Sequence, residues 1–445
     1  MKPKVLLINY DNADYVGWFP QSLGAIAGAL EYHHYPYEIA DFNIEHTPYE
    51  SLANILYEYS AFRVVCVSAC GGYWQYQQAK KIIGIINQLP NRKNLYLAVG
   101  GHLFAPDIKY FLDKWNVDCV CIADGEAWVK NLEVILENRV EVCSADTDIW
   151  KYRTPWVRFA TDQYRLMRMP HIEKTEFCLP ILSSRGCPFN CTFCYRLDKR
   201  VRLRPLEDLD DEVKYLKRAY NISYFAFADE LVMHSPRRTA EICDVMGKYK
   251  VKWDCNGRLN FANKSTLKEM KDAGCVFINY GIEALDDDVL KLMRKNLDVQ
   301  TIIEGVENTL RAGISPGLNI LWGSPGDNRE TLWKAVDFLL QYDDHAQLRT
   351  IRPVTPYPGS QLYKDAVEKG MIDDIEDFYE NKHKNSDLFT CNFMDMPLEE
   401  ANKNLCAANK RLIREYFQRT QTSYEKQAED LYFGKNQNFR GFRQR

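Results

Sequence analysis

Residues 184–194 read Ser-Arg-Gly-Cys-Pro-Phe-Asn-Cys-Thr-Phe-Cys and place Cys187, Cys191 and Cys194 in the spacing CxxxCxxC. A 4Fe–4S cluster held entirely by protein takes four thiolates. Three closely spaced thiolates can therefore hold three irons and leave the fourth open to a small molecule. A structural zinc site needs two CxxC-type pairs or a histidine partner, and neither stands near this segment. The spacing thus predicts an iron–sulfur cluster that binds and reduces an external ligand.

The cysteine spacing and its flanks resemble the radical S-adenosylmethionine (SAM) superfamily. This resemblance implies that SAM chelates the open iron and is cleaved to methionine and a 5′-deoxyadenosyl radical. It also implies an external electron donor such as flavodoxin or ferredoxin.

Length and composition set the broad class of the protein. A chain of 445 residues is too long for one core and suggests two domains. The net charge of −4 gives no electrostatic reason to expect a nucleic-acid partner. No secretion signal is recognised, and no apolar run is long enough to span a membrane. Fourteen cysteines in such a chain indicate a reducing compartment, and we expect a cytoplasmic protein.

Residues 1–140 alternate short apolar strands with helices, which predicts a parallel sheet covered on both faces. The predicted strands are 5–10, 37–42, 64–70, 94–101 and 119–123. Ligands of such doubly wound, Rossmann-like sheets bind outside the carboxyl ends of the strands. The loops at those ends are rich in glycine and aromatic residues, and they span 9–20, 68–74, 100–105 and 124–128.

The rest of the chain is predicted to form a second α/β domain. Residues 141–175 break the alternation and are interpreted as a linker, 176–370 as the second domain and 371–445 as a helical region. The second series of strands is predicted at 177–184, 224–228, 251–258, 276–282, 317–322 and 348–354. Six βα units are too few for a closed eightfold barrel. They fit the open, partial (β/α)6 barrel that the superfamily resemblance implies.

Several motifs of this second domain match superfamily positions that contact SAM. The resemblance assigns to SAM the residues Phe193, Asp229, Glu230, Arg258, Glu283 and Gly323. Arg258 is expected to pair with the SAM carboxylate through a bidentate guanidinium. Each motif alone has a simpler explanation: Asp229 and Glu230 could begin a helix, Glu283 could be a solvated acid, and Gly323 could belong to an ordinary turn.

The α/β domain before the barrel resembles the cobalamin-binding branch of the superfamily, through the segments 99–102 and 124–126. The residues expected to bind cobalamin are Ser68, Gly71, Gly72, Tyr73, Trp74, Gly100, Gly101, His102, Asp124, Gly125 and Glu126. Gly100 and Gly101 would let backbone approach a corrin closely. Asp124 departs mildly from the glutamate common there.

The cobalamin assignment leaves alternatives open. The Asp-x-His-x-x-Gly signature of His-ligated cobalamin is absent, so His102 is not assigned to cobalt. Tyr73 and Trp74 could instead begin a helix, and the whole domain could bind no corrin. Methylthiotransferases also carry an α/β domain before this barrel. However, their second set of cluster cysteines is not matched by Cys66, Cys70, Cys119, Cys121 and Cys143.

The favoured function is cobalamin-dependent methylation of an unactivated carbon in a small molecule, with cofactors that do the difficult chemistry. Ring closure, ring contraction or sulfur insertion on the same scaffold is a second reading, and a non-catalytic corrin or cluster carrier is a third. Tyr195, Arg196 and Asn319 are candidates to line the substrate space. No motif identifies the substrate.

Overall fold

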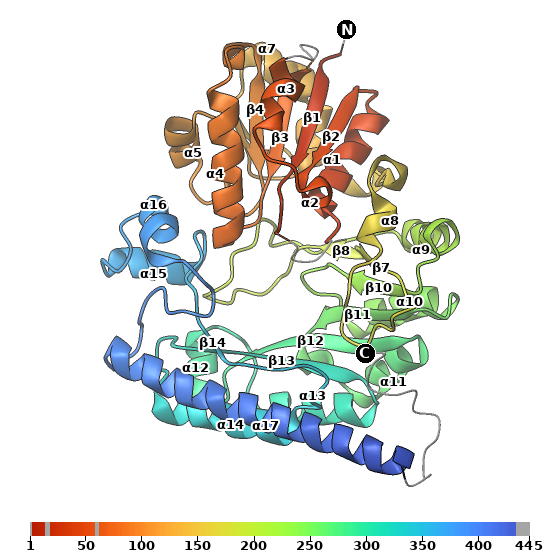
Figure 1. Cartoon of the computed structure of the whole chain (residues 1–445), viewed down its shortest axis with the longest axis vertical. Coiled ribbons are helices and arrows are strands. Elements are labelled where there is room, and N and C mark those ends of the chain that lie inside the picture. Colours follow the sequence, from red (N-terminus) through yellow and green to blue (C-terminus); the bar gives the residue numbers. More distant parts are fainter. Residues whose placement is uncertain (1, 14–17, 58–61, 433–445) are drawn as a thin grey trace.

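The computed structural model describes residues 2–13, 18–57 and 62–432. The structure contains two parallel sheets, each in its own domain. The N-terminal sheet is at the top of Figure 1 and the second sheet is below it. Among the described residues, no helix has the length and apolar character needed to cross a membrane.

The N-terminal sheet has six parallel strands in the order β2-β1-β3-β4-β5-β6. The strands are β1 (Lys4–Asn9), β2 (Tyr37–Asp41), β3 (Phe62–Ser68), β4 (Tyr96–Gly100), β5 (Cys119–Cys121) and β6 (Val142–Cys143). The order reverses between β1 and β3, which is the switch point where ligands of open α/β sheets bind. The predicted doubly wound sheet is therefore confirmed, and β6 extends it into the segment interpreted as a linker.

Helices cover both faces of this sheet (Figure 1). They are α1 (Gln21–Tyr32), α2 (Phe42–Glu45), α3 (Ser51–Tyr57), α4 (Tyr73–Asn87), η1 (Arg92–Asn94), α5 (Ile108–Trp115), α6 (Gly125–Lys130) and α7 (Leu132–Asn138). Side chains alternate along each strand. In β1, Val5 and Leu7 enter one hydrophobic core, whereas Leu6 and Ile8 enter the other.

The connector packs against the N-terminal domain through aromatic side chains. It contains η2 (Ile149–Lys151), η3 (Trp156–Arg158) and α8 (Thr161–Tyr164). The rings of Trp156, Phe159 and Tyr164 surround Phe19, with centroid distances of 4.3, 4.8 and 5.5 Å. These contacts make the connector part of the domain's core.

The second sheet also has six parallel strands, in the order β14-β13-β12-β11-β10-β7, and its two edge strands do not pair with each other. Its strands are β7 (Cys178–Ile181), β10 (Tyr224–Phe227), β11 (Lys252–Gly257), β12 (Cys275–Glu283), β13 (Ser315–Trp322) and β14 (Arg352–Pro353). The helices between them are α9 (Leu206–Tyr220), α10 (Pro236–Gly247), η4 (Leu259–Phe261), α11 (Lys264–Asp272), α12 (Asp287–Leu292), α13 (Val299–Arg311) and α14 (Arg329–Tyr342). The predicted open barrel is confirmed. A short antiparallel hairpin, β8 (Ser184–Arg185) with β9 (Arg202–Leu203), was not predicted.

The C-terminal helices are α15 (Gln361–Glu368), α16 (Ile375–Asp377), η5 (Phe378–Lys382) and α17 (Leu398–Tyr432). Helix α17 packs along α14 (Figure 1), and Asn409 on it bonds both backbone groups of Ile351 beside the edge strand β14. In η5, Tyr379 stacks on Tyr76 of α4 at a centroid distance of 4.3 Å. The helical region thus joins both domains. Residues 433–445 of the predicted helical region lie outside the described residues, and the boundaries at 140, 175 and 370 stay predictions.

Candidate functional site

The three cysteines lie in the loop between β8 and β9, which we call the cluster loop (residues 186–201). Cys194 is exposed, and Cys187 and Cys191 are partly exposed. Among the described residues no three ligands converge on a single metal ion. A cluster does not require such convergence, because each thiolate binds a different iron, and three neighbouring, accessible, unpaired thiols fit it.

Backbone contacts hold the cluster loop from both sides. Gly186 has a φ of +92°, and a Cβ there would lie 1.8 Å from the carbonyl oxygen of Arg200. The Gly186 amide donates to the Glu230 carboxylate at 2.9 Å. The Thr192 amide donates to the Met293 carbonyl at 3.0 Å. The loop is therefore shaped by its glycine and by hydrogen bonds rather than by the cluster alone.

Asp229 and Glu230 follow β10 but differ in exposure. Asp229 is fully buried and accepts bonds from the Ser183 amide and hydroxyl and from the Ser184 hydroxyl, at 2.6–3.1 Å. Burial raises the pKa of Asp229 to about 6. Glu230 is exposed and lines the cavity described below. Of the two predicted SAM ligands, only Glu230 has a carboxylate facing open space, whereas Asp229 holds the chain that leads into the cluster loop.

Arg258 and Glu283 lie directly behind the cluster loop. The Arg258 guanidinium lies 3.7 Å from the Phe189 ring centroid and donates to the backbone carbonyls of Lys295 and Asn296. Burial lowers the pKa of Arg258, while the neighbouring cysteine thiols oppose that shift. Glu283, whose φ is +71°, forms a buried ion pair of 2.9 Å with Lys295. Both predicted SAM residues thus already have protein partners.

Phe193 and Gly323 complete the set of predicted SAM residues. Phe193 is partly buried and packs against both hydrophobic clusters that flank the N-terminal sheet. Gly323 has a φ of +98°, and its amide donates to Asp327 at 3.0 Å. A Cβ on Gly323 would lie 2.6 Å from the ring of Phe389, which comes from the C-terminal region. Sequence reasoning missed Phe389, because no local motif marks a ring that arrives from another part of the chain.

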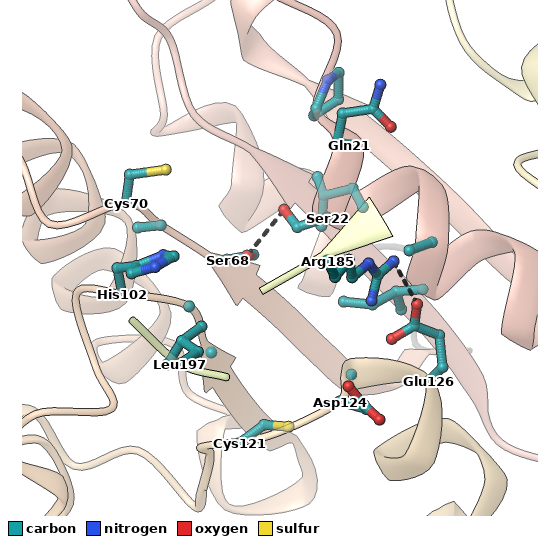
Figure 2. A pocket seen from close by; sticks show the side chains of 18 of the residues that line it. Gln21, Ser22, Ser68, Cys70, His102, Cys121, Asp124, Glu126, Arg185 and Leu197 are labelled. Carbon is teal, nitrogen blue, oxygen red and sulfur yellow. Dashed lines mark hydrogen bonds and ion pairs between the residues drawn. The ribbon is translucent and has the colours of Figure 1, made fainter. Parts of the chain in front are cut away.

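A cavity of about 570 Å³ lies at the carboxyl ends of the N-terminal strands and reaches the cluster loop (Figure 2). This volume is in the range of cofactor sites. Predicted cobalamin residues that line it are Ser68, Gly100, Gly101, His102, Asp124, Gly125 and Glu126. The second domain contributes Leu182, Arg185, Gly186, Leu197, Asp198, Arg200, Arg202, Ala228 and Glu230.

The remaining predicted cobalamin residues, Gly71 to Trp74, are not part of the cavity lining. The Gly71 carbonyl accepts a bond of 2.7 Å from the Tyr379 hydroxyl. Tyr73 begins α4, and the Trp74 indole donates to the Asp11 carbonyl at 2.9 Å. The neighbouring Cys70 lines the cavity instead. The contact of residues 71–74 with a corrin, which the sequence led us to expect, stays a prediction. The contacts of Gly71 and Trp74 with other parts of the protein do not favour it.

The chemistry of the cavity lining fits a large, mostly apolar ligand. Small and aliphatic residues form much of it, including Leu23, Ala25, Ile26, Val67 and Ala98. A Cβ on Gly125 would lie 3.0 Å from the Ile26 side chain, so the glycine keeps this part of the wall open. Such a lining suits the flat face of a corrin and the ring of its nucleotide.

His102 marks the point where the two domains face each other across the cavity. Its ring contacts Tyr195 edge-on at a centroid distance of 5.8 Å. Burial lowers the pKa of His102, and the Glu230 carboxylate partly opposes that shift. In Figure 2, His102 and Cys70 lie on one side of the cavity, with Arg185 and Glu126 on the other. Tyr195, which follows the third cysteine directly, contacts His102 but is not among the residues that line the cavity, and its predicted place beside the substrate stays a prediction.

The fold and the cysteine loop define a protein with a radical SAM core behind a Rossmann-like domain. Residues 181–339 match the Radical SAM superfamily and therefore form a radical SAM domain, which implies a 4Fe–4S cluster and SAM. An uncharacterized methyltransferase of Pyrococcus horikoshii is 29% identical over 198 residues, which are 43% of this chain and 42% of that protein. The bacteriochlorophyllide d C-8(2)-methyltransferase of Chlorobaculum tepidum is 25% identical over 59% of this chain and 60% of its own length.

A solved structure extends the similarity to both domains. The radical SAM methyltransferase TsrM of Kitasatospora setae, solved with cobalamin and a 4Fe–4S cluster bound, aligns with a TM-score of 0.67 at 16% identity. The alignment covers 83% of this chain and 75% of that chain. The predicted resemblance in fold to cobalamin-binding radical SAM proteins is thus confirmed. This chain spans about half the length of the curated relatives that it matches.

Proposed function

We propose that the protein is a cobalamin-dependent radical SAM enzyme that methylates an unactivated carbon of a small molecule. The observation that carries the proposal is the shared cavity: residues of the cluster loop and residues at the switch point of the N-terminal sheet line the same space. The relatives named as methyltransferases support the same reaction class. When bound, the cluster supplies the electron that cleaves SAM, and cobalamin supplies the methyl group.

The residues of this chain have distinct tasks in this proposal. Cys187, Cys191 and Cys194 hold the cluster, and Glu230 is the predicted SAM residue with an accessible carboxylate. Phe193, Asp229, Arg258, Glu283 and Gly323 are proposed to shape the SAM site, directly or by holding its walls. His102 and Tyr195 would border the substrate between the domains, with His102 in its neutral form because burial lowers its pKa.

The proposal includes the partners and the compartment of the protein. An electron donor such as flavodoxin or ferredoxin would reduce the cluster through the outer side of its loop, where Pro188 and Asn190 are exposed. A small molecule is the proposed substrate, since the matched relatives include one named as methylating a bacteriochlorophyllide. We propose a cytoplasmic location, since the free cysteines suit a reducing compartment.

The test is anaerobic reconstitution with iron, sulfide and hydroxocobalamin, followed by iron and corrin counting and a SAM-cleavage assay. The proposal predicts four irons, one corrin and 5′-deoxyadenosine. A variant with serine at all three cysteines is the control and should lose iron and SAM cleavage while remaining folded. Substrates are then screened for a mass gain of one methylene. A product without that gain would favour ring closure or sulfur insertion, and no SAM cleavage would favour a carrier.

A further inference from the structure

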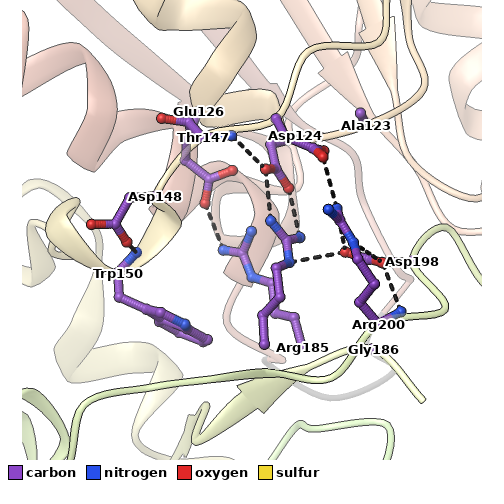
Figure 3. A network of polar contacts seen from close by, with 12 residues as sticks. Ala123, Asp124, Glu126, Thr147, Asp148, Trp150, Arg185, Gly186, Asp198 and Arg200 are labelled. Atoms are coloured by element: carbon purple, nitrogen blue, oxygen red, sulfur yellow. Dashed lines mark hydrogen bonds and ion pairs between the residues drawn. The ribbon is translucent and has the colours of Figure 1, made fainter. Parts of the chain in front are cut away.

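The two short strands that bracket the cluster loop carry arginines that reach into the N-terminal domain (Figure 3). Arg185 precedes the first cluster cysteine by two residues and pairs with Glu126 at 2.7 Å. Arg202 lies on the opposite strand, and its two terminal nitrogens each donate to one oxygen of Asp124 at 2.7 Å. Ion pairs therefore connect both ends of the cluster loop to the start of α6.

The carboxylates of these two ion pairs are deeply buried. The exposed fractions are 5% for Asp124 and 2% for Glu126. A carboxylate buried to this degree needs a cationic partner or several hydrogen-bond donors. The bidentate Arg202 pair is the strong, directional form of such a partner. The position of each carboxylate is thus tied to the arginine that neutralises it.

Further contacts join the same network to the connector and to the loop itself. Asp124 also accepts a bond of 3.1 Å from the Thr147 amide. Arg200 pairs with Asp146 at 2.8 Å, and Arg202 pairs with Asp198 at 2.9 Å. Asp198 and Arg200 belong to the cluster loop. The network therefore links the cluster loop, the connector and the first turn of α6 in one continuous set of polar contacts.

The same residues form one wall of the cavity, which includes Asp124, Gly125, Glu126, Arg185 and Arg202. We propose that Asp124 and Glu126 are positioning residues of the cluster loop, and that their ion pairs couple filling of the cavity to assembly of the cluster. The carboxylates then act through the arginines and not as direct ligands of cobalamin, in contrast to the expectation from sequence. This inference rests on the proposed function, because it takes cobalamin as the occupant of the cavity.

Coupling between two sites is reciprocal, so it can be measured from either ligand. Hydroxocobalamin affinity is measured on the full chain before and after anaerobic iron–sulfur reconstitution. We expect the cluster to tighten corrin binding by a factor of about 5 to 150, the usual range for coupled sites. In Asp124→Asn/Arg202→Gln and Glu126→Gln/Arg185→Gln, this factor should fall toward one.

The paired neutral substitutions avoid leaving a single buried charge behind. The four single variants complete two double-mutant cycles, in which a working ion pair gives non-additive effects. Arg153→Gln is the matched control, because Arg153 pairs with Asp208 and Asp211 outside the cavity. Near-ultraviolet circular dichroism establishes that each variant is folded before binding is measured.

Two outcomes would overturn the inference. The first is a wild-type affinity that does not change on reconstitution. The second is an unchanged coupling factor in the paired variants. If corrin binding is then weakened equally with and without the cluster, the carboxylates act as direct corrin ligands instead. If the wild type binds no corrin, the cobalamin part of the proposed function fails separately. In that case, the rate at which a chelator removes iron tests whether the ion pairs hold the cluster loop. Equal rates in the wild type and the paired variants would refute this role.

Discussion

The two halves of the cavity are built on different physical principles. On the radical SAM side, buried polar groups fix the residues near the cluster loop: Asp229 is saturated with hydrogen bonds, Arg258 bonds two backbone carbonyls, and Lys295 pairs with Glu283. On the N-terminal side, glycines and aliphatic side chains at the strand ends form much of the wall. The polar contacts there are the ion pairs at α6 and hydrogen bonds such as those from Ser68 to Ser22 and from Asn9 to Asp41. The first half is specified by charge and hydrogen bonding, and the second mainly by shape. We therefore expect substitutions near the cluster loop to reduce stability and activity more than substitutions in the part of the cavity that the N-terminal domain lines.

The largest expected effect comes from removing one cluster ligand. Cys191→Ser replaces a thiolate with a hydroxyl that does not bind iron well. We expect loss of the cluster and of SAM cleavage to below detection, measured by iron content and by electron paramagnetic resonance after reduction. Cys406→Ser changes a more accessible thiol, on α17, and should leave iron content unchanged. A normal cluster in Cys191→Ser would show that CxxxCxxC is not the cluster site.

The next effect tests the backbone of the cluster loop. Gly186→Ala adds a left-handed strain of about 1–2 kcal/mol and a collision with the Arg200 carbonyl worth roughly 1–3 kcal/mol more. Gly370→Ala is the control, because Gly370 has a φ of +66° but nothing within 4 Å of a new Cβ. Urea unfolding should show the larger loss of stability for Gly186→Ala. Equal losses would mean that the loop yields without penalty.

A third prediction concerns the buried acids of the barrel. Burial raises the pKa of Asp254 from its ordinary value of 3.8 to about 7, and one of its oxygens has no hydrogen-bond partner. The folded state therefore binds the proton more tightly than the unfolded state, so stability falls as the pH rises from about 4 to about 7. The shift corresponds to at most roughly 4 kcal/mol.

Asp254→Asn removes this ionisation. The variant should be more stable than wild type at pH 8, with the difference shrinking toward pH 4. Thermal unfolding across this pH range measures the effect, and Asp288→Asn, at an exposed position, serves as the control. A difference that does not depend on pH would show that Asp254 does not titrate there.

Sequence reasoning worked best where local order along the chain carries the information. Apolar runs predicted most strand positions correctly. The three cysteines lie within the matched radical SAM domain, and their assignment to the cluster stays a prediction. The arginines of the β8–β9 hairpin were missed although Arg200, Arg202 and Arg204 alternate as a strand would. Their partners lie in another domain, and no local pattern shows that a basic residue will neutralise a distant buried acid.

The assignment of residues 71–74 to a corrin illustrates a second limit. Glycines and aromatics after a strand are typical of a ligand loop, yet Tyr379, about 300 residues away, bonds Gly71. The cavity is lined instead by the residues just before this stretch, Ser68, Ala69 and Cys70. Likewise, Arg258 and Glu283 were matched to SAM by motif, but the partners that hold them come from the segment after α12. Sequence motifs place such residues near a site, whereas packing decides which atoms remain open.

The smallest expected effect tests the contact that fastens the C-terminal region to the upper cavity. Tyr379→Phe keeps the stack on Tyr76 but removes the hydroxyl that donates to the Gly71 carbonyl. One such hydrogen bond contributes about 1 kcal/mol, and urea unfolding should show a loss of that size. Tyr32→Phe, at an exposed position, is the control. If the N-terminal half of the cavity is specified mainly by shape, Tyr379→Phe should change corrin affinity only slightly. We expect this fold-change to be smaller than the coupling factor measured for the ion pairs at α6. A larger change in corrin affinity would mean that η5 positions the loop after β3, and the contrast between the two halves would fail at that loop.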